Sequence, residues 1–416
     1  MREEFFGARL RCGLEAYVLP KRGFRQRVAL FSARYGSIDL AFRTTGSEDV
    51  LETPPGIAHF LEHQLFKKEG GQDLLMEFGR YGASSNAFTD YTSTTYYFSA
   101  SESFEPNLAL LLRLTFSPYF RAKHVAKEKQ IIEQELRMYE DMPDYRGYRA
   151  LLGSLYRRHP VRIDVGGSIE SVRLIDAALL ERCYGVFYHP ANLMFVASGD
   201  LDPGEVFRSL DRDLPPDRFA RERVVSRVIP GEPPGVAEPR VECRMTASRP
   251  RVLVGLKDLS DGDVLGRDLT STALLTLLFG RSGGFYSKAY ESGLIDDSFS
   301  FSYTAECGFG FAVLGGETDR PDELAEAVCG VLDRARRKPF KKRDVERTKR
   351  RMQGKYLRAF DSPEDAVFLL LGCRMKGIEP FSVPGAIQRI TPERLGRRLR
   401  ELFRKENLAV SVVLPK

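Results

Sequence analysis

Two histidines and a glutamate occur together in the segment His59-Phe60-Leu61-Glu62-His63. On a helix, residues four positions apart lie one turn apart on the same face, so His59 and His63 can bind one ion together. Glu62 then lies beside the same open coordination position. The chain has only 5 histidines among 416 residues, and the number of such motifs expected by chance is on the order of 0.01. The pattern predicts a zinc site of the inverted HxxEH type; the alternative is two core or surface histidines that pair locally with Glu62.

A catalytic zinc usually takes three protein ligands and a water molecule, so a third ligand must come from elsewhere. The segment KHVAKEKQIIEQELRMYEDMP, residues 123–143, is a predicted helix with several glutamates. Glu128 and Glu135 are close to two turns apart and share one face, whereas Glu133 points about 160° away from Glu135. Three apolar residues at core-facing spacing are expected to carry Glu135 inward: Ile131, Ile132 and Leu136. The alternative is a helix whose glutamates are all solvated.

The elements that must hold these residues are predicted from periodicity. Prolines suit the entrance of a helix that runs from Ile57 to Lys67. Helices are also predicted over residues 151–156 and 178–188, and extended segments over 93–99 and 194–198. Strands joined by short turns, with helices grouped afterwards, indicate α+β domains whose sheets are largely antiparallel and packed with helices.

The sequence repeats itself once. Segments that begin at Ile175 and Ile390 align without a gap, and each has a helical pattern followed by an Asn-Leu step into a β-branched run. We therefore expect two similar domains related by internal duplication, residues 1–215 and 240–416. A Pro-, Gly- and charge-rich linker is predicted between them over residues 216–239.

The second half does not repeat the metal motif. Threonines stand opposite the two histidines, a leucine opposite Glu62 and a lysine opposite Glu135: Thr272, Thr276, Leu275 and Lys355. One zinc ion per chain is therefore expected.

Composition and charge exclude several other classes of protein. No run of 18 apolar residues and no leader-like N-terminus occurs, so a cytoplasmic protein without a membrane anchor is expected. The 6 cysteines are scattered singly, which fits reduced thiols. The net charge of +6 is the remainder of 63 basic and 57 acidic residues. The basic stretch over residues 337–358 is interpreted as a solvated helix face, and no nucleic-acid partner is predicted because no aromatic-interleaved basic motif accompanies it.

These motifs resemble the insulinase and pitrilysin family, which includes mitochondrial processing peptidase. The resemblance rests on HFLEH, the two glutamates seven residues apart, the SSNAFT turn (Ser84–Thr89), YEDMPD, HPVR, and YHPANL before a strand. It covers nearly the whole chain, is most specific over residues 55–200, and points to the short-chain, two-subunit bacterial branch.

The resemblance implies roles for individual residues. In that family the two motif histidines and a glutamate on a later helix hold zinc, which matches His59, His63 and Glu135. The motif glutamate, matching Glu62, is the catalytic base. Glu128 is expected to lie beside the zinc ligands without binding the metal itself.

The resemblance also implies a substrate-binding strand. Asn86 and Ala87 are expected on an edge strand that takes a peptide substrate in extended form. From its residue type alone, Asn86 is typical of a turn.

One part of the family pattern is missing. Active members often carry an Arg and a Tyr in the C-terminal half that hold the substrate carbonyl, and Gly283 and Asp296 stand at those places. Either Arg281 or Tyr286 substitutes, or a homologous partner subunit with the Arg-Tyr pair and no zinc motif completes the site. We favour the heterodimer; a homodimer is the further alternative.

Together these features predict a zinc-dependent endopeptidase of the processing type. It would cleave short or unfolded peptides by water attack on the scissile carbonyl, in a chamber that a partner closes. The rival interpretation is a catalytically silent scaffold or binding subunit of the same fold.

Overall fold

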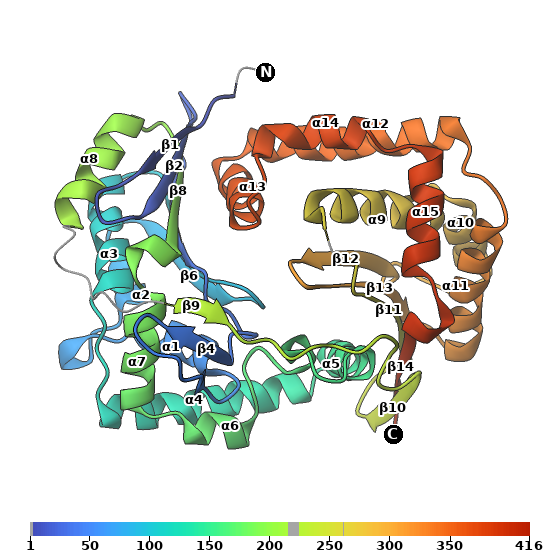
Figure 1. Ribbon diagram of the computed structural model, residues 1–416, viewed down its shortest axis with the longest axis horizontal. Helices are drawn as coiled ribbons and strands as arrows, with labels where there is room; N and C mark the ends of the chain where they lie inside the picture. Colours follow the sequence, from blue (N-terminus) through green and yellow to red (C-terminus); the bar gives the residue numbers. More distant parts are fainter. Residues whose placement is uncertain (1–2, 215–223, 261) are drawn as a thin grey trace. The chain divides into compact units, whose positions relative to one another are not determined.

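The computed structural model describes residues 3–214, 224–260 and 262–416. They form two compact units (Figure 1). Unit 1 takes the described residues of Met1–Leu136, Ile163–Ile229 and Ala359–Met375, and unit 2 takes those of Arg137–Arg162, Pro230–Arg358 and Lys376–Lys416. The two-domain α+β fold is confirmed.

A six-stranded sheet forms the centre of unit 1, in the order β1-β2-β8-β3-β7-β6. Its strands are β1 (Phe6–Arg9), β2 (Glu15–Pro20), β3 (Arg27–Ala33), β6 (Ala83–Thr89), β7 (Thr94–Ala100) and β8 (Leu193–Gly199). Every neighbouring pair is antiparallel except β2 and β8. All seven residues of β8 are buried, as expected for a central strand covered on both faces. β6 lies at the edge, so one side of its backbone has no neighbouring strand in this sheet.

Unit 1 also contains helices. They are α1 (Ile57–Leu65), α2 (Leu74–Arg80), α3 (Phe104–Phe116), α4 (Ala122–Glu140), α6 (Ile169–Leu174), α7 (Ala177–Phe187), α8 (Pro203–Asp213) and α13 (Pro363–Met375). Of these, α1, α2, α3, α8 and α13 contact the six-stranded sheet. α13 is late in the sequence, yet it packs against β8 and β3 of unit 1. A small second sheet has the order β5-β4-β9 and contains β4 (Ala41–Thr44), β5 (Leu51–Glu52) and β9 (Val224–Arg227).

Unit 2 contains a five-stranded sheet in the order β10-β14-β11-β13-β12. Its strands are β10 (Arg240–Met245), β11 (Arg251–Asp258), β12 (Ser300–Glu306), β13 (Phe309–Glu317) and β14 (Leu408–Pro415). Only β10 and β14 run parallel. The helices are α5 (Pro143–Leu155), α9 (Val264–Phe279), α10 (Gly284–Glu291), α11 (Pro321–Arg336), α12 (Lys342–Arg358), α14 (Val383–Gln388) and α15 (Pro392–Leu402).

The two sheets have the same topology. Apart from β1, which unit 2 does not repeat in its described five-stranded sheet, the strand orders match. In each sheet the last strand, β8 or β14, follows a short 3-10 helix ending in Asn192 or Asn407 and lies beside a parallel strand, β2 or β10. The predicted internal duplication and the largely antiparallel sheets are thus visible in strand order as well as in sequence.

The predicted linker is only partly described, because residues 216–223 lie outside the described residues. The chain passes between the units at Ile229 and Pro230. Glu232 then anchors the following segment to unit 2, since its carboxylate accepts backbone N–H groups of Arg157, Arg158 and His159 and the Nζ of Lys257. The boundaries 1–215 and 240–416 stay a prediction, because each compact unit also takes in shorter stretches from the other half of the chain.

Two local predictions are wrong. The SSNAFT segment is not the turn that its residue types indicate. It forms β6, in which Asn86 pairs with Tyr97 of β7, so the edge strand that the family resemblance implies for Asn86 and Ala87 is confirmed. Ile131 does not face the core, because 39% of it is exposed, whereas Ile132 and Leu136 are buried. The predicted helices and extended segments elsewhere agree with α1, α5, α7, β7 and β8. Within the described part of the chain, no helix is both long and apolar enough to cross a membrane.

Candidate metal centre

A tight loop contact fixes the start of α1. Gly56 has φ +90°, and a Cβ there would lie 2.3 Å from the carbonyl oxygen of Gly166. Gly167 has φ +78°, and its Cβ would lie 2.4 Å from the oxygen of Pro55. Ser171 Oγ donates to that same oxygen at 2.8 Å. Only glycine permits both the positive φ and this close backbone approach, so the loop and the helix entrance hold each other in place.

The body of α1 is anchored by its apolar side chains. Phe60, Leu61 and Leu65 are completely buried. His59 and His63 lie on another face, and their side chains are 14% and 22% exposed. The helix therefore presents both imidazoles at the edge of the core, where an ion and a substrate can reach them.

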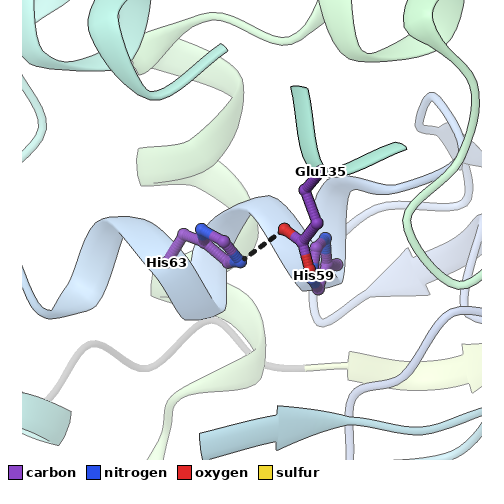
Figure 2. A group of neighbouring side chains, drawn as sticks. All are labelled: His59, His63 and Glu135. Carbon is purple, nitrogen blue, oxygen red and sulfur yellow. Dashed lines mark ion pairs between the residues drawn. The ribbon is translucent and has the colours of Figure 1, made fainter. Parts of the chain in front are cut away.

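The predicted ligands converge (Figure 2). His63 Nε2 lies 3.4 Å from Glu135 Oε2, and His59 Nε2 lies 3.8 Å from Glu135 Oε1. One ligand atom from each of these three residues lies within 4.8 Å of the other two. Glu128 Oε1 lies 3.1 Å from His63 Nδ1. Glu133 points elsewhere and pairs with Arg173 at 2.9 Å.

These residues fit a zinc ion. Ligand atoms 2.0–2.1 Å from a tetrahedral ion lie about 3.3 Å apart, close to the separations between Glu135 and the two histidine Nε2 atoms. The contact with Glu128 directs His63 Nε2 toward Glu135, as is usual for a zinc-binding histidine. His59 Nδ1 is buried without a hydrogen-bond partner among the described residues, so its ring is held mainly by packing.

The protonation of the histidines is set by their surroundings. Burial lowers the pKa of His59 to about 3, so this imidazole is neutral and able to bind a metal. Burial also acts to lower the pKa of His63, but the contact with Glu128 and the charges of Glu62 and Glu135 raise it overall. The carboxylates thus attract a positive charge to this position, which a metal ion can supply in place of a proton.

Glu62 has a partner that the sequence interpretation missed. Thr89 Oγ1 donates to Glu62 Oε2 at 2.6 Å. Burial raises the pKa of Glu62, and the hydrogen bond from Thr89 opposes that rise. Thr89 is the last residue of β6, and its place in SSNAFT, three residues after Asn86, was the available signal.

The predicted substrate-binding pair lies on the edge strand. Asn86 is exposed and Ala87 is half-buried in β6. Asn86 Oδ1 accepts the backbone N–H of Ala87 at 2.9 Å. A peptide that pairs with this N–H must therefore displace the Asn86 side chain.

The residues at the positions of the Arg-Tyr pair, and those weighed as replacements for it, belong to unit 2. Asp296 accepts from Arg249 Nη1 at 2.6 Å, and Gly283 lies before the first turn of α10. Arg281 pairs with Asp297 at 3.2 Å and lies over the ring of Tyr286. Neither Gly283 nor Asp296 offers the chemistry of an arginine or a tyrosine.

Comparisons with known proteins show the family to which this chain belongs. Residues 42–167 match the model for Insulinase (Peptidase family M16), and residues 175–352 match that for the Peptidase M16 inactive domain. The protein YmfH of Bacillus subtilis (strain 168), described as an uncharacterized zinc protease, is 37% identical over 100% of this chain and 98% of its own. The chain belongs to the insulinase family, peptidase family M16.

Solved structures of family M16 proteins show the same fold. An M16-like peptidase from Alicyclobacillus acidocaldarius is 35% identical, with a TM-score of 0.95 over 100% of this chain and 99% of its own. Pitrilysin is 16% identical, with a TM-score of 0.73 over 100% of this chain but only 45% of its own. Family membership and the relatives' names support a zinc protease, and the second family model, for an inactive domain, agrees with the lack of the motif in unit 2.

Proposed function

We propose that this chain is a zinc-dependent endopeptidase with one zinc ion held by His59, His63 and Glu135. The observation that carries the proposal is the convergence of these three side chains beside Glu62, on elements fixed by the loop at Gly56 and by the core. When bound, zinc supplies Lewis acidity, which acidifies water and polarises a peptide carbonyl.

Glu62 acts as the general base and then as the general acid. Its burial strengthens it as a base, and one of its oxygens is held by Thr89, which leaves the other free to take a proton from the attacking water. The same carboxyl then gives the proton to the leaving amine. Glu128 orients His63 through its Nδ1.

The peptide substrate binds along β6. The open side of this edge strand offers main-chain groups to an extended segment, and Ala87 N–H is one of them. Backbone pairing requires an extended chain, so short or unfolded peptides are the substrate class. Processing of leader segments fits this requirement.

A homologous partner subunit completes the site. Gly283 and Asp296 lack the groups expected to hold the substrate carbonyl, and Asp296 is engaged with Arg249. Pitrilysin, whose fold this chain matches over about half of that protein, has a second half that a partner would replace here. A heterodimer in the cytoplasm, without nucleic acid, is proposed.

The test compares the purified chain with its Glu62→Gln variant. Metal analysis is expected to find about one zinc per chain in both. A quenched fluorescent peptide library is expected to be cleaved about 10²–10⁴-fold more slowly by the variant, because general-base catalysis contributes a factor of that size. Assays with and without a relative that lacks the motif test the partner.

A chain that binds no zinc after reconstitution would instead be the silent scaffold. The intact set of ligands speaks against that alternative, since a scaffold has no need of four correctly placed side chains.

A further inference from the structure

A hollow of about 400 Å³ in unit 1 lies beside the metal centre and has no part in the chemistry above. The segment that follows α1, the residue before α2 and the first half of α4 line it. Its lining is Lys67, Asp73, Lys123, His124, Lys127 and Ile131, together with Glu128 of the metal centre.

Residues that line the hollow share one face of α4 with Glu135 of the metal centre. His124, Glu128, Ile131 and Glu135 follow one another at spacings of four, three and four, so they form one stripe of the helix. With a rise of 1.5 Å per residue, Ile131 and Lys127 lie about 6 and 12 Å from Glu135 along the axis. An extended peptide covers that distance in about two to four residues.

The charge in the hollow is positive and uncompensated. Lys67 is paired with Asp73 at 2.7 Å, and the carboxylate of Glu128 is turned to His63. Lys123 and Lys127 are exposed, and neither has a hydrogen bond or ion pair with any residue in the described parts of the chain. Ile131 is 39% exposed and gives the hollow an apolar patch.

We propose that this hollow is a substrate subsite that binds a glutamate or aspartate side chain two to four residues from the scissile bond. Lys123 and Lys127 hold the carboxylate, and Ile131 packs against the methylene groups of the substrate side chain. The proposal rests on the proposed peptidase function, and it adds acidic peptides as the preferred substrate class.

The test measures peptide binding in the Glu62→Gln background, so that no substrate is consumed. The cleavage site is first located by mass spectrometry with the unmodified protein. Two labelled peptides then differ only in Glu or Gln at the positions two to four residues from that site. Both carry a C-terminal amide, which removes the terminal carboxylate as an alternative ligand.

Fluorescence anisotropy is expected to show about tenfold tighter binding of the Glu peptide at low salt, and a smaller preference as salt is raised. Lys123→Glu/Lys127→Glu is expected to abolish or reverse the preference. Arg404→Glu/Lys405→Glu, an equal charge change at two exposed positions of unit 2, is expected to keep it. Equal binding of the two peptides, or a preference that survives the double variant, would overturn the inference.

Cleavage of the Gln peptide by the unmodified, zinc-loaded chain is measured in parallel. Cleavage without any acidic preference overturns the subsite and leaves the peptidase function in place. A chain without zinc or cleavage overturns the peptidase function and, with it, the subsite.

Discussion

Units 1 and 2 have one sheet topology but different chemistry. The strand orders β2-β8-β3-β7-β6 and β10-β14-β11-β13-β12 match, and each contains the same single parallel pair. Unit 1 presents two imidazoles and a carboxylate at one point, whereas the aligned positions of unit 2 hold Thr272, Thr276 and Lys355. The fold therefore supplies a place for a site, and a few side chains decide its chemistry.

The aligned region of unit 2 is also polar, but it is organised differently. Leu275, opposite Glu62, is completely buried in the core. Asp268 lies near Thr272, Lys355 and Lys376, and burial raises the pKa of its carboxyl despite these neighbours. Without imidazoles, this region resembles a charged packing contact rather than a zinc site.

The largest expected effect is a loss of zinc affinity on substitution of Glu135, with no such loss on substitution of Lys355, the residue aligned with it in unit 2. Glu135→Gln removes a charged ligand and is expected to weaken zinc binding by at least ~10²-fold, because the site then holds only two strong ligands. Lys355→Gln, the matched change in unit 2, is expected to leave zinc affinity unchanged. Competition titration with a zinc-sensitive dye measures both, and equal loss in the two variants would contradict the assignment.

Stability in acid should depend on a histidine of unit 2. Burial lowers the pKa of His159 from its ordinary 6.5 to about 4. Between these values the unfolded chain takes up a proton that the folded chain refuses, so stability is lost as pH falls from 6.5 toward 4. Between pH 7 and pH 5 the loss is expected to be about 2 kcal/mol.

Denaturant unfolding at the two pH values, with His159→Gln as the control, measures this contribution. The variant is expected to lose about 2 kcal/mol less than the unmodified chain. Hydrogen exchange in β11 reports the same change within unit 2. An identical pH dependence in both proteins would show that His159 does not titrate as inferred.

A smaller effect is expected at Glu128. Glu128→Gln keeps the shape of the side chain but removes the charge that faces His63 Nδ1. Residues that hydrogen-bond to a zinc ligand typically contribute about 10–100-fold to metal affinity or activity. The loss of zinc affinity in the variant is expected to lie in that range. Thr348, which aligns with Glu128, already donates to the backbone oxygen of Asp344, so Thr348→Val serves as the control in unit 2.

The smallest effect concerns the orientation of the base. Thr89→Val removes the hydroxyl that donates to Glu62 and is expected to lower kcat by about tenfold, with KM and zinc content little changed. Thr89→Ser should restore kcat, because it keeps the donor. A change in KM alone, or no recovery with serine, would point to a structural role for Thr89.

Much of the metal centre could be predicted because it depends on helical geometry. The spacing of His59 and His63 and that of Glu128 and Glu135 each define one face of one helix, and both faces meet as expected. The duplication was likewise visible, since the Asn-Leu step before the last strand recurs in both halves.

Other features follow only from contacts between distant segments. The polar residue types of SSNAFT favour a turn, and only the family resemblance places Asn86 and Ala87 on an edge strand; pairing with β7 makes the segment a strand. That pairing brings Thr89 to Glu62, 27 residues away in sequence. The prediction that Ile131 faces the core is wrong because it also depends on distant segments. Periodicity marks a helix face without showing which other element covers it.

Sequence alone thus determined the types of the candidate ligands, their spacing and the repeat, because these depend on local backbone geometry and on residue chemistry. Tertiary structure decided the partner of Glu62, the exposed hollow beside α4, the anchoring of Glu232 and the place of α13 in unit 1. Each of these joins residues far apart in the chain, and the free energy that selects such contacts comes from burying whole elements together rather than from any short segment.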